Sequence, residues 1–417
     1  MEKFFKLNEK GSNIKTELIA GLTTFLAMAY ILGVNPAVLA DAGMDKASVF
    51  LATAISAGVA SIIMGLVANY PVALASGMGV NALFAYTICG QMGFSWAAAL
   101  SAVFISGVIF IIISVTGVRK AIINAIPVQL KLAIGAGIGF FIAFVGLKNA
   151  GIIVASPSTF VTIGNLTDPT VLLAIVGLLI TIALVIKNVP AAVFVGMIIT
   201  AVIGIILGFM GMADMPTLPE HFISFDFELQ AFGACFSGIS ELFANPFQAF
   251  VVIFSFLFVD FFDTAGTLVA IGNRIGLIND KGELENAEQA LLADAVGTVF
   301  GAVLGTSTVT SFVESSSGVG VGGRTGLTAC TSGVCFLLAV FLSPLILSTV
   351  TNAVTAPALI VVGIMMILMY SISNGIACGF IVYTIAMIAA GKAKQVHPTV
   401  WALMIIFVLY FATPYIM

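Results

Sequence analysis

The stretch TSTVTSFVESSSGVGVGGRTG, residues 306–326, is a polar interruption in a chain that is otherwise mostly apolar. It carries nine hydroxyl side chains, one carboxylate (Glu314) and one guanidinium (Arg324), and apolar sequence flanks it on both sides. Polar groups that face lipid cost free energy, and irregular backbone at membrane depth is tolerated only when protein or a watery cavity surrounds it. We therefore expect this stretch to be a broken membrane span that lies inside the protein.

The composition places the whole chain in a membrane. Of its 417 residues, 60% are hydrophobic and only 8% are charged, whereas a soluble domain is roughly a quarter charged. The apolar runs are continuous for about twenty residues and do not alternate with period two, which indicates helices and excludes a β-barrel. The net charge of -4, without any basic tract, gives no support to nucleic-acid binding. The sequence therefore predicts an all-α polytopic membrane protein.

Fourteen apolar segments are expected to span the membrane, of which the third and the tenth are broken. They are 18–40, 49–69, 71–89, 93–117, 129–149, 168–187, 190–211, 246–272, 289–305, 307–320, 324–349, 353–370, 374–391 and 398–416. This gives an N-terminal tail (1–16), a first half (17–212), a polar linker (213–245) and a second half (246–417). The end of the linker, FELQAFGACFSGISEL, could form an interfacial helix. The N-terminus lacks the features of a signal peptide, so the first segment is expected to remain as a span.

The distribution of lysine and arginine predicts the orientation. Four lysines in the first 15 residues place the N-terminus in the cytoplasm. Alternating the spans then puts seven further cationic residues inside: Arg119, Lys120, Lys131, Lys187, Arg274, Lys281 and Arg324. Lys46, Lys148, Lys392 and Lys394 fall outside. The last two are an exception to the rule that positive charge stays inside.

The two halves of the chain resemble each other. PVALASGMGVNALFAY (71–86) and GTSTVTSFVESSSGVG (305–320) are both rich in small residues, and each is the third segment of its half. Seven spans in each half is an odd number, so the two repeats would be inverted relative to the membrane. Paired glycine-interrupted segments in corresponding positions indicate the substrate site of a transporter. There the N-termini of half-helices can offer free N–H donors to a polar ligand.

Four acidic residues lie within the apolar segments, where a charge is costly. Asp260 and Asp263 are three residues apart in FLFVDFFDTAGTL, hence on one helical face, with Thr264 beside them. Glu314 precedes the serines of the broken tenth segment, and Asp294 lies in LLADAVGTVFG. The alternative for each is a purely structural role in capping or pairing with buried helix groups, and for Asp294 we expect such a supporting role.

Asn81 in the broken third segment, Ser315 beside Glu314 and Thr24 in the first span complete the candidate substrate site. Asn81 could equally stabilise the break itself. No lysine or arginine lies at comparable depth, and a poorly solvated carboxylate without a fixed cation can hold a proton near neutral pH. This favours proton coupling over anion transport, with a small heterocycle as the ligand of the acceptor groups. One of four phenylalanines could stack on its ring: Phe84, Phe258, Phe261 or Phe312.

Other chemistries find no support. Neither His221 nor His397 lies beside a second metal ligand, and we predict no metal and no cofactor. The five cysteines have no CxxC spacing and are expected to be small buried hydrophobes. No nucleotide-binding loop, HExxH motif or nucleophile elbow is present, so the chain is not expected to be an enzyme.

Five segments together resemble a known family. They are TELIAGLTTFLAMAYILGVNPAVL (16–39), GMGVNALFAY (77–86), GAGIGFFIAFVGLKNAGI (135–152), FVDFFDTAGTL (258–268) and GTSTVTSFVESSSGVGVGGRTGL (305–327). In this order they resemble the AzgA-like adenine/guanine/hypoxanthine permeases of the nucleobase–ascorbate transporter superfamily. The resemblance implies proton-coupled symport of purine bases across the cell (inner) membrane, and it leaves a homodimer open.

The resemblance also implies roles for parts of the chain. Spans 1–4 and 8–11 would form a core domain that moves against a gate domain of spans 5–7 and 12–14. Asp260 and Glu314 match the carboxylates that hold the purine, and Asn81 matches a polar position in the site. Asp263 and Asp294 match acidic positions needed for transport.

The chain departs from the family in one region. APALIVVGIMMILMYSISNGIACGF (356–380) runs on without the usual polar loop, so the second repeat is shortened near 366–372. Either two spans are minimal and closely joined, or one is lost and the following topology inverts, which would bring Lys392 and Lys394 inside. The alternatives for function are another nucleobase, uracil or xanthine, on the same fold, or a purine-binding membrane protein that does not transport. A channel is disfavoured because polarity is concentrated in two broken segments.

Overall fold

The computed structural model describes residues 2–115, 140, 143–157, 160–189, 191–225, 227–277, 284–357, 360–361, 401 and 404. The spans expected at 129–149, 353–370, 374–391 and 398–416 lie wholly or largely outside these residues, as does the shortened region near 366–372. Within the described residues, eight helices are long and apolar enough to cross a membrane. They are Ile14–Ala40, Lys46–Ala68, Trp96–Val115, Pro169–Ile186, Ala192–Phe209, Pro246–Leu268, Ala287–Leu304 and Gly326–Thr349. The chain is therefore a helical membrane protein.

The first span consists of two helices, α2 (Ile14–Met28) and α3 (Ile31–Ala40), which meet at Tyr30. The side chain of Asn13 accepts a hydrogen bond from the Thr16 N–H and so caps the start of α2. Pro36 lies inside α3 and cannot donate a backbone hydrogen bond there. The second span, α4 (Lys46–Ile63), starts at the capping carboxylate of Asp45 and continues into a π-helical turn, η1 (Met64–Ala68).

Among the described residues of the first half, three further long helices and one hairpin follow. These are α6 (Trp96–Val115), α9 (Pro169–Ile186), α10 (Ala192–Phe209) and the antiparallel strands β2 (Ile153–Ser156) and β3 (Phe160–Ile163). Asp168 caps α9 by accepting from the N–H and the hydroxyl of Thr170, at 2.8 and 2.6 Å. These hydrogen bonds lower the pKa of the Asp168 carboxyl.

The second half is built from α13 (Pro246–Arg274), α14 (Ala287–Leu304), α16 (Gly326–Ala339), η3 (Val340–Leu342) and α17 (Ser343–Thr349). In the linker segment 227–242, which could form an interfacial helix, the structure has two four-residue helices, α11 (Ala234–Ser237) and α12 (Ile239–Leu242). Gly233 has a positive φ of 70°, so no regular helix runs through it into α11. Gly238 separates the two short helices. A side chain at Gly238 would collide with the Ala97 carbonyl of α6, so the linker packs directly on that span.

The two broken segments meet each other. The third segment runs as β1 (Leu74–Ser76), α5 (Met78–Ala82) and the π-helix η2 (Leu83–Gln91), and the tenth as β4 (Val309–Ser311) and α15 (Ser315–Gly320). Strands β1 and β4 pair antiparallel with Ala75 opposite Thr310. Two backbone bonds extend the ladder, from Gly77 N–H to the Thr308 carbonyl and from Phe312 N–H to the Ala73 carbonyl, at 3.0 and 3.1 Å. The described chain is thus helical, as predicted, and short strands occupy both breaks.

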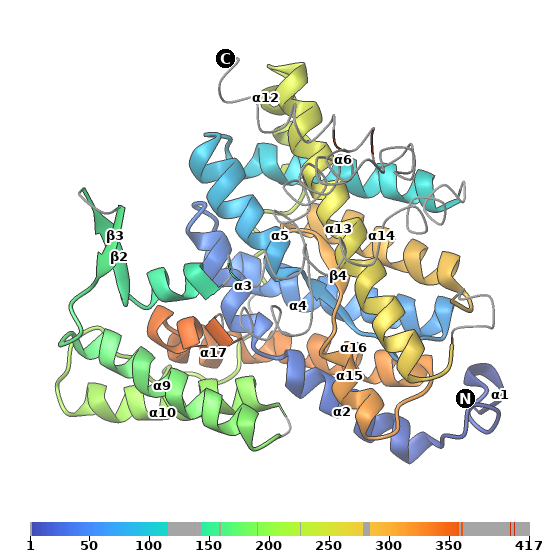
Figure 1. The fold of residues 1–417 in the computed structure, drawn as a ribbon, viewed down its shortest axis with the longest axis horizontal. Coiled ribbons are helices and arrows are strands. Elements are labelled where there is room, and N and C mark those ends of the chain that lie inside the picture. Colours follow the sequence, from blue (N-terminus) through green and yellow to red (C-terminus); the bar gives the residue numbers. More distant parts are fainter. Residues whose placement is uncertain are drawn as a thin grey trace, which may run out of the picture.

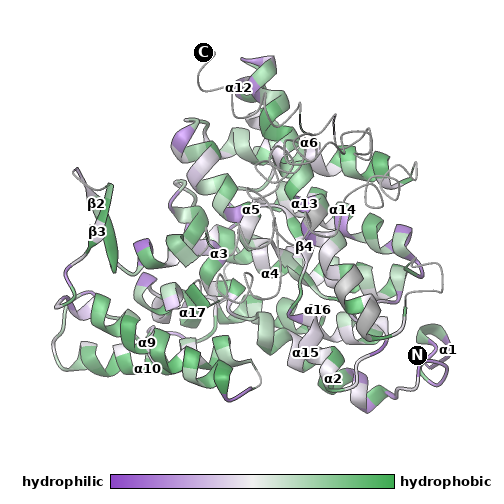
Figure 2. Ribbon diagram, viewed as in Figure 1, coloured by the Kyte–Doolittle hydropathy of each residue, from purple (hydrophilic) through white to green (hydrophobic). Residues whose placement is uncertain are grey.

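The helices divide into an outer and an inner set. In Figure 1, α9, α10 and the β2–β3 hairpin lie on the left, while α13, α14 and β4 lie in the centre and right. Figure 2 shows α9 and α10 as almost uniformly hydrophobic, whereas hydrophilic residues gather around α5 and β4. The polar groups therefore lie among the inner helices, where both breaks are found.

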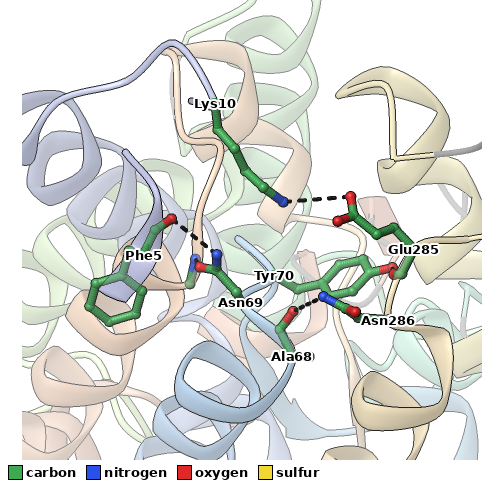
Figure 3. A network of polar contacts seen from close by, with 8 residues as sticks. Phe5, Lys10, Ala68, Asn69, Tyr70, Glu285 and Asn286 are labelled. Carbon is green, nitrogen blue, oxygen red and sulfur yellow. Dashed lines mark hydrogen bonds and ion pairs between the residues drawn. The ribbon is translucent and has the colours of Figure 1, made fainter. Parts of the chain in front are cut away.

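A polar cluster holds the N-terminal segment against the inner helices (Figure 3). The Asn69 amide donates to the Phe5 carbonyl at 3.0 Å, and Lys10 Nζ lies 3.9 Å from Glu285 Oε2. The Tyr70 hydroxyl donates to the backbone carbonyl of Glu285. Burial, together with the Glu285 charge, raises the pKa of Tyr70, so its hydroxyl stays protonated as a donor. The cluster ties the first residues to the ends of α4 and α14.

Candidate functional site

Three carboxylates from α13 and α14 surround β4. Asp263 accepts a hydrogen bond from the Thr310 hydroxyl at 3.3 Å. Asp294 accepts from the hydroxyls of Thr264, at 2.7 Å, and Ser311, at 3.3 Å. These contacts bring Asp263, Asp294 and Thr264 together against the strand of the tenth segment.

Asp260 joins the same group through Thr298 of α14. The Thr298 hydroxyl lies 3.3 Å from Asp260 Oδ2 and 2.9 Å from the Val309 carbonyl of β4. Asp260 and Asp294 are fully buried, so their carboxyl groups are far from bulk water. Burying such groups is costly unless hydrogen bonds or a ligand compensate for the lost solvation. The strand β4 is therefore lined by acceptor groups on the side of α13 and α14.

Glu314 stands at the start of α15 and approaches the first span. Its Oε1 accepts a hydrogen bond of 2.7 Å from the hydroxyl of Tyr30, which lies at the junction of α2 and α3. The Glu314 side chain is partly accessible, whereas Tyr30 is buried. Asp263 is close enough to Glu314 for their charges to interact. Glu314 is thus connected to the carboxylates of α13 and presents part of its surface away from them.

Asn81 connects the third segment to the tenth. The hydroxyl of Ser307 donates to Asn81 Oδ1, and the Asn81 amide group donates to the sulfur of Met78 at 3.7 Å. Sulfur is a weak acceptor, so the Asn81 amide N–H groups can still donate to a stronger acceptor. The residue stabilises the break through Ser307 and also keeps donor capacity for a ligand.

Thr24 and Ser315 occupy scaffold positions. The hydroxyl oxygen of Ser315 accepts a hydrogen bond of 3.0 Å from the Ala73 N–H and so fixes the start of α15 to the third segment. Thr24 is buried against Gly318 of α15, where no side chain would fit. Within the described part of the chain, the Thr24 hydroxyl has no hydrogen-bond partner. The structure therefore brings both residues to α15, Ser315 on the side of the third segment and Thr24 on the side of α2.

The four candidate phenylalanines are all buried, but in two different clusters. Phe258, Phe261 and Phe312 share one hydrophobic cluster with Tyr30, next to Glu314. Phe84 lies in a second cluster, where its ring centroid is 6.2 Å from that of Phe256. The first three therefore belong to the same cluster as the residue whose hydroxyl contacts Glu314, and Phe84 does not.

A network of neutral polar side chains was missed by the sequence analysis. The amide of Asn35 in α3 donates to the hydroxyls of Thr53, at 2.6 Å, and Thr306, at 3.0 Å. Ser76 at the end of β1 lies 2.7 Å from the Thr306 hydroxyl. These four residues are fully buried, so the network holds the first span to both breaks. The available signal was Asn35 itself, an amide inside an apolar span like Asn81.

Glu17 is a second buried polar residue whose role was not predicted from the sequence. It is fully buried in the first turn of α2, and its carboxylate accepts bonds from the N–H groups of Arg324, Thr325 and Thr328, at 2.9, 3.3 and 3.2 Å. These are donors at the N-terminus of α16, which a carboxylate satisfies and whose dipole it complements. The guanidinium of Arg324 donates to the carbonyls of Val319 and Gly323. Glu17 therefore anchors the end of the polar stretch at 306–326.

The arrangement as a whole can bind a small polar molecule. Four carboxylates and one amide come from α13, α14, α15 and α5, and aromatic rings lie beside Glu314. Carboxylate oxygens accept from N–H donors, and the amide both donates and accepts. Such a set suits a heterocycle that carries N–H groups on its edge.

Comparison with known proteins matches the chain to a family of transporters. The sequence pattern that defines the Permease family matches residues 15–388. The guanine/hypoxanthine permease PbuG of Bacillus subtilis is 49% identical over 99% of this chain and 99% of its own length. The adenine permease AdeP of Escherichia coli is 41% identical over 98% of this chain and 95% of its own.

Solved structures with little sequence identity share the fold. The transmembrane domain of the cyanobacterial bicarbonate transporter BicA has a TM-score of 0.63 at 17% identity, over 95% of this chain and 97% of that one. The SLC26A9 structure has a TM-score of 0.55 at 12% identity, over 99% of this chain and 63% of that one.

Proposed function

The chain belongs to the Permease family, a family of transporters and not of enzymes, and from this premise we propose that it carries purine nucleobases across the cell membrane together with protons. The relatives at 39–49% identity that are named purine permeases support the substrate class. The observation that carries the proposal is the pairing of β1 with β4, because it brings the carboxylates of α13 and α14 to the same place as Glu314 and Asn81.

In this proposal Asp260 and Glu314 accept hydrogen bonds from the N–H groups of the purine, and Asn81 offers its amide to the acceptor edge of the ring. Asp263, Asp294 and Thr264 support these groups and take part in proton coupling. A carboxylate that lies in a poorly solvated site can hold a proton at neutral pH, and it can release the proton when a ligand or solvent changes its surroundings. Ser315 and Thr24 also contact the substrate in this proposal, and Ser315 in addition ties the start of α15 to the third segment.

The transport cycle that we propose is alternating access. The first four and the eighth to eleventh spans form the core and carry the site, and the remaining spans form the gate. The described gate helices α9 and α10 lie to one side of the inner helices, which agrees with a separate body (Figure 1). The N-terminus is cytoplasmic, as the lysines near it suggest.

Uptake of radiolabelled hypoxanthine, guanine and adenine in cells without purine permeases of their own tests the proposal. The wild-type chain should accumulate at least one purine, and a protonophore should abolish the accumulation. Glu314→Ala should lose uptake, whereas Glu288→Ala, at an exposed residue in the first turn of α14, should keep it. Uptake that survives the protonophore would exclude proton coupling, and unchanged uptake by Glu314→Ala would exclude Glu314 from the site.

The second candidate is transport of another nucleobase, uracil or xanthine. The fold does not distinguish among these, because it is shared with a bicarbonate transporter. Competition by each unlabelled base in the same assay separates the two, since a carrier of hypoxanthine, guanine or adenine should be inhibited by these bases and not by uracil or xanthine.

A further inference from the structure

We infer that Tyr30 is a positioning and specificity-determining residue of the substrate site, acting through Glu314. The inference rests on the proposed function for its kinetic consequences, but the contact between the two side chains does not depend on it. Tyr30 would hold one oxygen of the Glu314 carboxylate and leave the other for a single N–H group of the purine.

The geometry supplies a strong and local contact. The Tyr30 hydroxyl donates to Glu314 Oε1 at 2.7 Å, across 284 positions of sequence. A hydrogen bond to a carboxylate at this distance is of the charge-assisted kind, and it is stronger than a bond between neutral groups. Tyr30 has only 1% of its surface exposed, so water does not compete for the hydroxyl.

The ring of Tyr30 is fixed by its surroundings. It lies at the junction between α2 and α3 and packs in the same hydrophobic cluster as Phe258, Phe261 and Phe312. Buried side chains in such clusters occupy one rotamer. The hydroxyl therefore has a defined position, and it imposes that position on Glu314 Oε1.

Glu314 needs such a partner. Its side chain is long, partly accessible and placed at the start of a six-residue helix. A glutamate in that situation loses considerable rotamer entropy when a ligand fixes it. Because Tyr30 has already fixed one oxygen, the second oxygen is presented to a ligand in advance.

This arrangement predicts a preference among purines. Hypoxanthine offers the ring N1–H on its pyrimidine edge, whereas guanine offers N1–H together with an adjacent exocyclic amino group. A free carboxylate can accept two neighbouring N–H bonds, one on each oxygen. Tyr30 occupies Oε1 and so reduces the advantage that guanine would have over hypoxanthine.

Tyr30→Phe tests the inference, with Tyr70→Phe as the matched control. Both tyrosines are 1% exposed and each donates one hydrogen bond, but the acceptor of Tyr70 is a backbone carbonyl away from the site. Uptake is measured for hypoxanthine and guanine and normalised to the amount of protein in the membrane. Loss of one hydrogen bond to a charged group should raise the KM for hypoxanthine about tenfold, with Vmax changed less than about twofold. The KM for guanine should rise less, so the ratio of the two KM values shifts toward guanine.

An infrared measurement tests the contact without any substrate. The carboxyl band of Glu314 is identified as the band that disappears in Glu314→Gln of the purified protein. It should shift in Tyr30→Phe and stay in place in Tyr70→Phe. Glu314→Asp serves if Tyr30→Phe does not accumulate. It withdraws the carboxylate by one methylene from the Tyr30 hydroxyl, so its carboxyl band should lie where a carboxyl group without that hydrogen bond absorbs.

The outcomes separate the two proposals. Absence of purine uptake by the wild-type chain would overturn the proposed function, and the infrared band would still decide whether Tyr30 holds Glu314. An unchanged band position in Tyr30→Phe would overturn the inference. If the wild-type chain transports both hypoxanthine and guanine, an equal rise of the two KM values in Tyr30→Phe would also overturn it.

Discussion

Removal of the Glu17 carboxylate should destabilise the protein more than any other single loss of a hydrogen-bonding group described above. Glu17 is fully buried, and its two oxygens accept four bonds, from three backbone N–H groups and from the Thr328 hydroxyl at 2.5 Å. Glu17→Ala leaves the N–H groups of Arg324 and Thr325 without an acceptor where α2 meets α16, and it leaves Thr328 with only its other bonds, from its N–H to the Thr325 carbonyl at 3.1 Å and from its hydroxyl to the backbone carbonyl of residue 17 at 3.5 Å. An unsatisfied buried donor costs about 1–3 kcal/mol, and partial relaxation reduces the sum. We therefore expect a loss of about 3–5 kcal/mol, as for other buried charge networks that lose one partner.

Glu17→Gln separates the acceptor role from the charge. Glutamine keeps one carbonyl oxygen but loses the second acceptor and the charge beside the N-terminus of α16. The loss should be about 1–2 kcal/mol. The ordering of the two variants follows from the number of donors that each leaves unsatisfied.

The assay is an SDS titration of the purified protein in detergent micelles, followed by far-UV circular dichroism. Glu241→Ala is the control, because the Glu241 carboxylate also accepts bonds from a backbone N–H and a hydroxyl, both of Ser95, but at an exposed position. Its loss should be about 1 kcal/mol. A Glu17→Ala variant that is no less stable than Glu241→Ala would refute the reasoning that burial multiplies the cost.

Three further predictions use the same titration. Gly326→Ala should destabilise the protein by about 3 kcal/mol or more, since a Cβ there would overlap the facing carbonyl of η1. Gly320→Ala, with open space around it, should change stability by less than about 1 kcal/mol. Equal effects of the two variants would contradict this prediction. Asn69→Ala loses its bond to the N-terminal segment and places alanine at φ 57°, so stability should fall by about 2–3 kcal/mol. An unchanged unfolding midpoint would show that the cluster in Figure 3 does not stabilise the protein. Asp294→Asn keeps an acceptor for two hydroxyls and should cost less than Asp294→Leu, which should lose about 2–4 kcal/mol. Equal losses would show that the charge, which both variants remove, matters and the acceptor does not.

The sequence predicted the membrane class and most of the acidic residues for one physical reason. Charges within apolar runs are so costly that their presence marks a buried role, and this criterion selected Asp260, Asp263, Asp294 and Glu314. The structure places all four beside or within the tenth segment. The same criterion applied to amides selected Asn81 and would also have selected Asn35.

Other features had no usable local signal. Glu17 lies one residue before the expected start of the first span, so it does not stand out as a charge within an apolar run, although it is buried. Tyrosine is common near membrane interfaces and gives no indication of a partner, so Tyr30 could not be identified. The strands β1 and β4 are three residues long, and periodicity cannot distinguish such strands from irregular backbone. The number of spans and their inverted arrangement stay predictions.

The pairing of β1 with β4 has a consequence for how the chain is made. Leu74 and its partner Ser311 are separated by 237 positions, so the ribosome must synthesise more than half of the protein before the third segment finds its partner. Until then the peptide groups of β1 lack the backbone partners that hydrocarbon demands. The first half must therefore wait at the translocon, in contact with water or with an assembly factor, and release into lipid depends on the arrival of the second half. Two separately expressed halves should accordingly accumulate only when both are made in the same cell.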